Sequence, residues 1–228
     1  MTESKSSIEL SREREPGAAP VASAPETEAV DLSRARLTPE ALLLRRRTSQ
    51  GGYVFDLRDA DAFKAGHLPG AFSLPYELLE SNLHRLPFSG DLMLYDGGEG
   101  SAAQGVKQLL DNGFGDSYYL EEGYDALKAA LENSPDEINY ERLSADERKV
   151  AIEKVLDEKV REFLARDGGG LDVQAIEDDR ILVAYFGACG GCGSSTAGTL
   201  RFIQTTLTVS LNHEIEVVPV EEGEAHHH

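Results

Sequence analysis

"RILVAYFGACGGCGSST", residues 180–196, joins a run of apolar residues to two cysteines and then to small hydroxyl residues. The apolar run predicts a strand, and a helical stripe of apolar residues over 194–211 predicts a helix after it. Cys189 and Cys192 therefore lie at a predicted strand-to-helix turn, with two glycines between them. No other cysteine occurs among the 228 residues.

This turn is suited to a metal or redox centre. A Cys-x-x-Cys loop curls back on itself, so both sulfurs point at one centre. Backbone N–H groups at the start of the following helix favour thiolate, the form that binds metal. The neighbouring small residues leave room for a bulky inorganic core; they are Gly190, Gly191, Gly193, Ser194 and Ser195.

The residues around the turn predict a compact α+β domain over 146–222, with the element order α-β-β-α-β. A capping box, SADE at 144–147, opens its first helix. We expect that helix to bury Ile152, Val155, Leu156, Val160, Phe163 and Leu164. The strands LDVQAI and RILVAYF are joined at 177–179, and EIEVVPV at 214–220 is the last strand. The helix before it has its apolar stripe at Leu200, Ile203, Leu207 and Leu211.

The first part of the chain predicts a tail followed by another domain. Residues 1–36 are rich in Ser, Glu, Ala and Pro, which predicts disorder. Residues 37–131 alternate apolar runs with helical stretches, which predicts a small parallel α/β sheet. The runs are YVFDL (53–57), AFSL (71–74), LMLYD (92–96) and SYYLE (117–121). Polar, aperiodic residues at 132–145 form the expected linker.

The motif DLRDADAFKAGHLPGAFSLP, residues 56–75, resembles the front half of a rhodanese domain. The matching positions are Asp56, Arg58, Gly66, His67, Pro69, Gly70 and Ala71. GFGDSYYLEEGYDAL, residues 113–127, is similar to that family's closing strand and helix. The resemblance covers about ninety residues. It implies a parallel-sheet domain whose active members carry sulfur as a persulfide on a cysteine at a strand end.

The residues at that strand end argue against sulfur transfer. The strand LMLY is followed by Asp96, in the loop DGGEGS, which has no thiol. Glu99 adds negative charge, and the loop lacks the family's basic residue and is about one residue short. A carboxylate cannot hold a persulfide, so we expect a domain without enzymatic activity that serves for docking. An alternative, Asp96 as a phosphate-accepting nucleophile, is opposed by Glu99. His67 is expected to pack in its turn.

The second domain resembles the C-terminal domain of NifU, a family of iron–sulfur cluster scaffolds and carriers. The matching segments are VREFLARDGG, residues 160–169, and GACGGCGSST, residues 187–196. Gly170 stands where the family often has an acid, and Gly193 where it often has proline. The resemblance implies a cluster that bridges a homodimer and is passed to client apoproteins, with Cys189 and Cys192 as ligands.

The number of thiols agrees with a shared cluster. A 4Fe–4S cluster normally takes four thiolates, and this chain has two cysteines. Full ligation by protein therefore needs a second copy of the chain, and we expect 4Fe–4S rather than 2Fe–2S. A dithiol–disulfide oxidoreductase is the alternative function, since Cys-x-x-Cys at a helix start also suits that chemistry. Zinc shared between two chains and a purely structural pair are further alternatives.

Composition limits the partners and the location. A net charge of −19 argues against nucleic acid and anionic membranes as partners. The first residues contain no apolar signal segment, so we expect a cytoplasmic protein whose thiols stay reduced. His226, His227 and His228 look like a tag remnant and are excluded as ligands. The expected partners are a second copy, client apoproteins and a sulfur donor that docks on the first domain.

Overall fold

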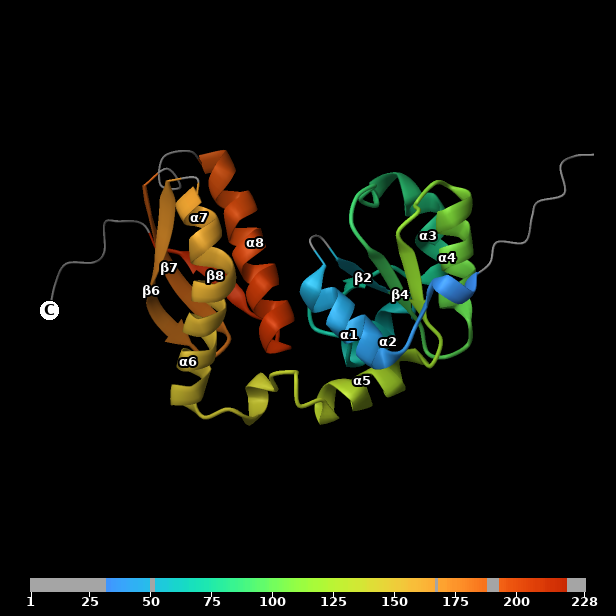
Figure 1. Ribbon diagram of the computed structural model, residues 1–228, viewed down its shortest axis with the longest axis horizontal. Helices are drawn as coiled ribbons and strands as arrows, with labels where there is room; N and C mark the ends of the chain where they lie inside the picture. Colours follow the sequence, from blue (N-terminus) through green and yellow to red (C-terminus); the bar gives the residue numbers. More distant parts are fainter. Residues whose placement is uncertain (1–31, 50–51, 167, 188–192, 221–228) are drawn as a thin grey trace, which may run out of the picture. The chain divides into compact units, whose positions relative to one another are not determined.

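The computed structural model describes residues 32–49, 52–166, 168–187 and 193–220, which form two domains (Figure 1). The first domain contains η1 (Leu32–Arg34), β1 (Arg36–Leu37), α1 (Pro39–Thr48), β2 (Tyr53–Asp56), α2 (Ala60–Ala65), β3 (Phe72–Ser73), α3 (Tyr76–Asn82), η2 (Leu83–Arg85), β4 (Leu92–Tyr95), α4 (Ser101–Asp111), β5 (Ser117–Leu120) and α5 (Gly123–Asn133). The second contains η3 (Tyr140–Arg142), α6 (Ala145–Val155), η4 (Leu156–Arg161), α7 (Glu162–Arg166), β6 (Gly169–Glu177), β7 (Arg180–Gly187), α8 (Gly193–Leu211) and β8 (Glu216–Pro219).

The first domain is built on a parallel sheet with the strand order β1-β5-β4-β2-β3. One apolar core lies between the sheet and helices α1 and α5, and a second lies between the sheet and helices α3 and α4. The central strand β4 is buried along its whole length, because helices cover both faces. The predicted parallel α/β fold is confirmed.

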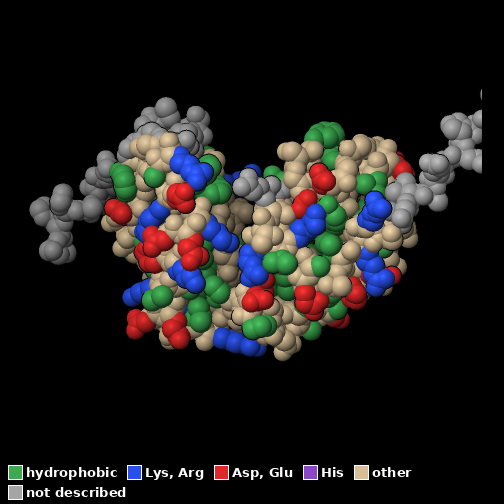
Figure 2. Space-filling view, in the orientation of Figure 1, with side chains coloured by type: hydrophobic (Ala, Val, Ile, Leu, Met, Phe, Trp, Pro, Cys, Tyr) green, Lys and Arg blue, Asp and Glu red, His purple; other side chains and the backbone are tan. Residues whose placement is uncertain are grey.

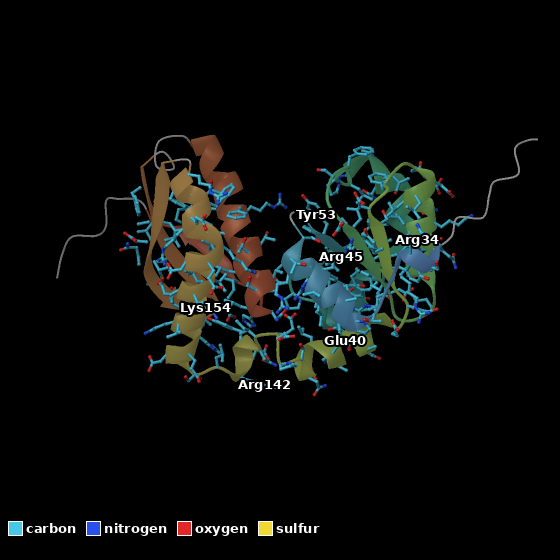
Figure 3. The ribbon with its side chains drawn as sticks, viewed as in Figure 1. Arg34, Glu40, Arg45, Tyr53, Arg142 and Lys154 are labelled. Carbon is cyan, nitrogen blue, oxygen red and sulfur yellow. The ribbon has the colours of Figure 1, made fainter. Side chains whose placement is uncertain are left out.

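Local sequence signals account for the ends of several helices in this domain. The Thr38 side chain accepts a hydrogen bond from the Ala41 N–H at 3.2 Å, and Pro39 is the first residue of α1. Gly113, at φ +89°, follows α4 in the conformation that ends a helix. Arg45 of α1 (Figure 3) binds Asp91 at 2.9 Å and lies 3.8 Å from the ring centroid of Tyr118. This arginine therefore fastens the helix to the sheet.

Five short elements of the first domain are not assigned to particular residues by the sequence. They are η1, β1, α2, α3 and η2. The sequence predicts that residues 32–36 belong to the tail, yet residues 32–34 form η1 and Arg36 begins β1. Strand β1 exists through its pairing with β5, in which Arg36 faces Tyr119. A two-residue strand has no period of its own, so local sequence could not predict it. The rest of the predicted tail lies outside the described residues.

The second domain has the predicted order α-β-β-α-β. Its sheet runs β6-β7-β8, with β6 antiparallel and β8 parallel to β7. Helices α6, α7 and α8 pack on one face of this sheet around a single core (Figure 1). The capping box is present: Ser144 Oγ accepts from the Glu147 N–H, and the Glu147 carboxylate accepts from the Ser144 N–H at 2.8 Å.

One residue of the predicted helical stripe was placed wrongly. Phe163 is 50 % exposed, whereas the other five members of the stripe are buried. The cause is η4, a π-helical stretch at Leu156–Arg161 that changes the helical phase before α7. Phe163 therefore leaves the core side and pairs with Phe202 of α8, with ring centroids 4.9 Å apart.

The segment that belongs to neither core is shorter than the predicted linker at 132–145. Helix α5 extends to Asn133, and Tyr140 of η3 is 1 % exposed within the second core. The Tyr140 hydroxyl donates a hydrogen bond to the Asp178 carbonyl at 3.0 Å, and its ring stacks on His213 at 4.9 Å. Tyr140 therefore anchors the start of the second domain on the turn between β6 and β7.

Acidic and basic side chains are interspersed over the visible surface of each domain (Figure 2). Among the described residues, no helix has both the length and the apolar character needed to span a membrane.

Candidate functional sites

The cysteine segment is flanked by the two elements that the sequence predicts. Strand β7 ends at Gly187, and helix α8 begins at Gly193. Cys189 and Cys192 lie between them, outside the described residues. Within the described part of the chain, no group of three or more His, Cys, Asp or Glu side chains is arranged to hold a metal ion. Cys189 and Cys192 stay the candidate ligands that the sequence predicts.

Phe186 is the last large side chain before the cysteine segment, and it is 50 % exposed. It pairs in register with Gly170 of β6. A Cβ atom added to Gly170 would lie only 2.3 Å from two carbons of the Phe186 ring, so the ring lies directly over the glycine. With the ring in this position, a side chain at residue 170 has no room. Sequence reasoning missed Phe186, because a strand pattern alone does not show which face is left uncovered.

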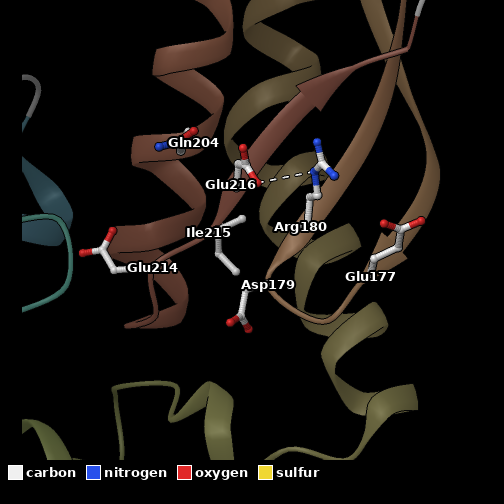
Figure 4. Close-up of a pocket in the computed structure, with 7 residues that line it drawn as sticks. All are labelled: Glu177, Asp179, Arg180, Gln204, Glu214, Ile215 and Glu216. Carbon is white, nitrogen blue, oxygen red and sulfur yellow. Dashed lines mark ion pairs between the residues drawn. The ribbon is translucent and has the colours of Figure 1, made fainter.

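A shallow acidic hollow of about 360 Å³ occupies the opposite end of the same sheet (Figure 4). Acidic side chains and Arg180, which pairs with Glu216 at 3.4 Å, dominate its lining. Arg180 begins β7, whereas the cysteine segment follows the end of that strand. At roughly 3.3 Å per residue, the length of β7 separates the two. The hollow is therefore not the cysteine site.

In the first domain, Asp96 follows the central strand β4 and is 1 % exposed. Its carboxylate accepts hydrogen bonds from the Gly98 N–H at 2.7 Å, the Ala102 N–H at 2.8 Å and the Ser101 hydroxyl at 3.0 Å. These donors belong to the loop after β4 and to the N-terminus of α4. An array of this kind ordinarily receives an external anion. Here the side chain of Asp96 fills it from within.

The other residues of this loop reinforce that arrangement. Glu99 is exposed, and its carboxylate lies 3.1 Å from the Ser101 hydroxyl, whose one proton it shares with Asp96, so a second negative charge lies at the entrance. The loop also packs tightly on the start of α5, because a Cβ atom on Gly123 would lie only 2.6 Å from the Gly98 nitrogen. A buried carboxylate with both oxygens bound is a poor nucleophile. The geometry therefore opposes the phosphate-accepting alternative for Asp96.

The residues of the front motif hold the turn together. Arg58 donates two hydrogen bonds to the buried carboxylate of Asp56, at 2.9 and 2.6 Å, and a third to the Gly66 carbonyl at 2.7 Å. Burial opposes the charge on Arg58, but the hydrogen bonds and charge of Asp56 leave its pKa raised. His67 stacks on Phe63 with centroids 3.8 Å apart, as expected for a residue that packs in its turn.

Two tyrosines complete this cluster, and sequence analysis did not identify them. The guanidinium of Arg58 lies 3.9 Å from the ring centroid of Tyr124. The Tyr95 hydroxyl accepts a hydrogen bond from the Leu68 N–H at 3.1 Å. Burial raises the pKa of Tyr95 well above its usual range, and the charge of Asp56 adds to the effect. Tyr95 therefore stays neutral and serves as part of the scaffold.

Comparisons with known proteins agree with the division of the chain into two domains. A family model for rhodanese-like domains matches residues 39–130, and a family model for NifU-like domains matches residues 152–218. The thiosulfate sulfurtransferase GlpE of Pseudomonas putida (strain GB-1) is 30 % identical over 95 residues, which cover 41 % of this chain and 84 % of that protein. The same values hold for GlpE of strain KT2440.

Among solved structures, the crystal structure of the Alr3790 protein from Anabaena sp. is 28 % identical to this chain. The match covers 41 % of this chain and 85 % of the solved one, with a TM-score of 0.38. The chain belongs to the rhodanese-like family through its first domain, and residues 152–218 of its second domain match the model of NifU-like domains.

Proposed function

We propose that this protein is an iron–sulfur cluster carrier in which Cys189 and Cys192 of two chains hold one cluster and pass it to client apoproteins. The observation that carries the proposal is the match of residues 152–218 to NifU-like domains, together with a Cys-x-x-Cys pair between β7 and α8. The chain has only two cysteines, so a cluster with four thiolate ligands needs two chains. A reducing compartment such as the cytoplasm would keep these thiols free.

The proposal gives the rhodanese-like domain a docking role without sulfur transfer. Residues 39–130 contain no cysteine, and the Asp96 carboxylate occupies the array of donors in the loop after β4. A persulfide anion would have to compete with this internal anion and with Glu99. The domain would then recruit a client apoprotein or a sulfur donor through its surface.

Anaerobic reconstitution with iron and sulfide tests the carrier function. We expect a dimer with about four irons per two chains, the stoichiometry of one four-thiolate 4Fe–4S site, seen by iron analysis and Mössbauer spectroscopy. Cys189→Ser and Cys192→Ser should each abolish the visible absorbance of the cluster, while circular dichroism shows that the fold remains. The same preparation should form no more thiocyanate from thiosulfate and cyanide than a heat-inactivated control.

Two results would overturn the carrier function. A monomer that keeps a complete 4Fe–4S cluster would show that two protein thiolates suffice. Efficient, repeated reduction of insulin disulfides through a Cys189–Cys192 disulfide would instead favour the oxidoreductase. Tight zinc binding with no uptake of iron and sulfide would favour a shared zinc site.

A further inference from the structure

The three-stranded sheet of the second domain has one face that its own helices do not cover (Figure 1). Along β7, Ile181, Val183 and Tyr185 pack into the core with the helices. Side chains alternate along a strand, so the residues between them lie on the opposite face. With their in-register neighbours on β6 and β8 they form what we call the open face, whose apolar members are Ala175, Leu182, Ala184, Phe186 and Val218.

The open face also carries negative charge along its edge strand, β6. Asp172 pairs in register with Ala184, and Glu177 pairs with Arg180, so both acids lie on this face. Both side chains are exposed, and neither carboxylate has an ion-pair or hydrogen-bond partner within the described part of the chain. Arg180, by contrast, is paired with Glu216 at 3.4 Å. The face therefore combines an apolar row with two carboxylates that no cation of the domain neutralises.

The spacing of these two carboxylates matches a helix laid along the strand. Asp172 and Glu177 lie five residues apart on β6, which corresponds to about 16 Å at roughly 3.3 Å per residue. An α-helix covers this length in about three turns, or about eleven residues. Helices on both faces of a sheet are a common layered architecture. In the described residues of this domain, the helices lie on one face alone.

Charge favours a cationic partner over another copy of this chain. Each chain has a net charge of −19, and two open faces brought together would oppose their unpaired carboxylates. A partner helix with an apolar stripe and two Lys or Arg side chains about three turns apart would instead cover the apolar row and neutralise both acids. Phe186, which is 50 % exposed, offers that helix an aromatic contact at the end of β7.

We propose that the open face docks a client apoprotein through a basic, amphipathic helix of this kind. The inference rests on the proposed function, which gives a client its reason to bind. A client held here lies beside the strand end from which the cysteine segment starts. Gly170 acts as a positioning residue for the aromatic contact, because a Cβ atom there would lie 2.3 Å from the Phe186 ring that crosses β6.

Two synthetic helical peptides test the docking chemistry without any cluster. Both carry a leucine stripe; one has two lysines about eleven residues apart, and the other has glutamates at those positions. Titrated into the isotope-labelled full chain, the lysine peptide should shift the NMR amide signals of Asp172, Leu182 and Phe186. The glutamate peptide should bind at least about tenfold more weakly, because its charges meet like charges on the open face.

A charge variant and its matched control assign the contact to the two acids. Asp172→Asn combined with Glu177→Gln should raise the dissociation constant of the lysine peptide about fivefold, since two exposed ion pairs are lost. Glu158→Gln combined with Glu162→Gln removes the same charge from exposed positions on the helical side of the domain. This control should leave the constant unchanged.

The aromatic contact is tested in the same titration and in cluster transfer. Phe186→Ala should weaken binding of the lysine peptide about tenfold. Phe163→Ala is its control, because Phe163 is also 50 % exposed but lies on the helical side. The lysine peptide extended by four cysteines in the spacing of a bacterial ferredoxin is a synthetic acceptor. It should receive the cluster of the reconstituted chain faster than its glutamate counterpart, and Phe186→Ala should remove that advantage.

Three results would overturn the proposal while leaving the carrier function intact. They are equal binding of the two peptides, NMR shifts confined to the helical side, and equal rates of transfer to the two acceptors. Shifts of Asp172 and Phe186 that depend on the concentration of the chain alone would assign the open face to a second copy and also overturn it. If the wild-type chain takes up no cluster, the proposed function itself fails.

Discussion

At the scale of single residues, Asp96 decides the chemistry of the first domain. Its carboxylate is almost fully buried and accepts hydrogen bonds from two backbone N–H groups and one hydroxyl. Buried donors without a partner destabilise a fold, so the loop after β4 requires an internal anion as long as no external one is bound. The sequence predicted an acid that repels substrates. It could not show that the same acid also supports the loop, because that depends on where the N–H groups of α4 point.

Replacing Asp96 should therefore cost stability. We expect Asp96→Ala to lower the free energy of unfolding of the first domain by about 1–3 kcal/mol, because the buried N–H of Ala102 and the more exposed N–H of Gly98 lose their acceptor. Chemical denaturation followed by circular dichroism measures the loss. Glu99→Gln is the control, since Glu99 is exposed and its removal should change stability by less than about 0.5 kcal/mol. Equal stability of Asp96→Ala and wild type would contradict a supporting role for this carboxylate.

At the scale of elements, the sequence predicted the long, periodic parts and missed the short ones. Strands β2, β4 and β5 and helices α1, α4 and α8 follow apolar patterns that repeat over enough residues to be recognised. Helix α2 has six residues, fewer than two turns, so its period is not visible. The exposure of Phe163 depends on the π-helical stretch before it, which leaves no mark in the apolar pattern.

The capping box at the start of α6 changes the pKa of one of its residues. Hydrogen bonds from the hydroxyl and the N–H of Ser144 lower the pKa of Glu147 below its ordinary value. A depressed folded-state pKa means that this carboxylate stabilises the fold above its ordinary pKa of 4.5. The contribution is lost as the pH falls through the folded-state pKa.

Ser144→Ala should weaken the pH-dependent stabilisation by Glu147. We expect the pKa of Glu147, followed by NMR titration, to rise toward its ordinary value when the hydroxyl donor is removed. The variant should be less stable than wild type at neutral pH, and the difference should shrink in acid, where Glu147 is protonated in both proteins. Ser134→Ala, outside the capping box, is a suitable control. A Glu147 pKa that is unaffected by the substitution would show that the capping box is not formed in solution.

At the scale of the whole molecule, the two domains differ in the charge that surrounds their candidate sites. The anion-binding loop of the rhodanese-like domain is filled by Asp96 and flanked by Glu99, so it disfavours small anions. The NifU-like domain has its cysteines in the longest uncharged stretch of a strongly acidic chain. If two such chains share a cluster as proposed, their association must overcome repulsion between their acidic surfaces while gaining bonds to that cluster.

Salt should for this reason strengthen the cluster-loaded dimer. Two chains of net charge −19 repel each other, and this repulsion is screened as the Debye length falls from about 30 Å at about 0.01 M salt to about 3 Å at about 1 M. The iron–thiolate bonds of the proposed shared cluster are little affected by screening. We therefore expect the dimer dissociation constant, measured anaerobically, to fall as sodium chloride is raised. Glu99→Gln should leave the slope almost unchanged, because it removes a single charge outside the NifU-like domain. A dissociation constant that rises with salt would instead mean that ion pairs across the interface hold the two chains together.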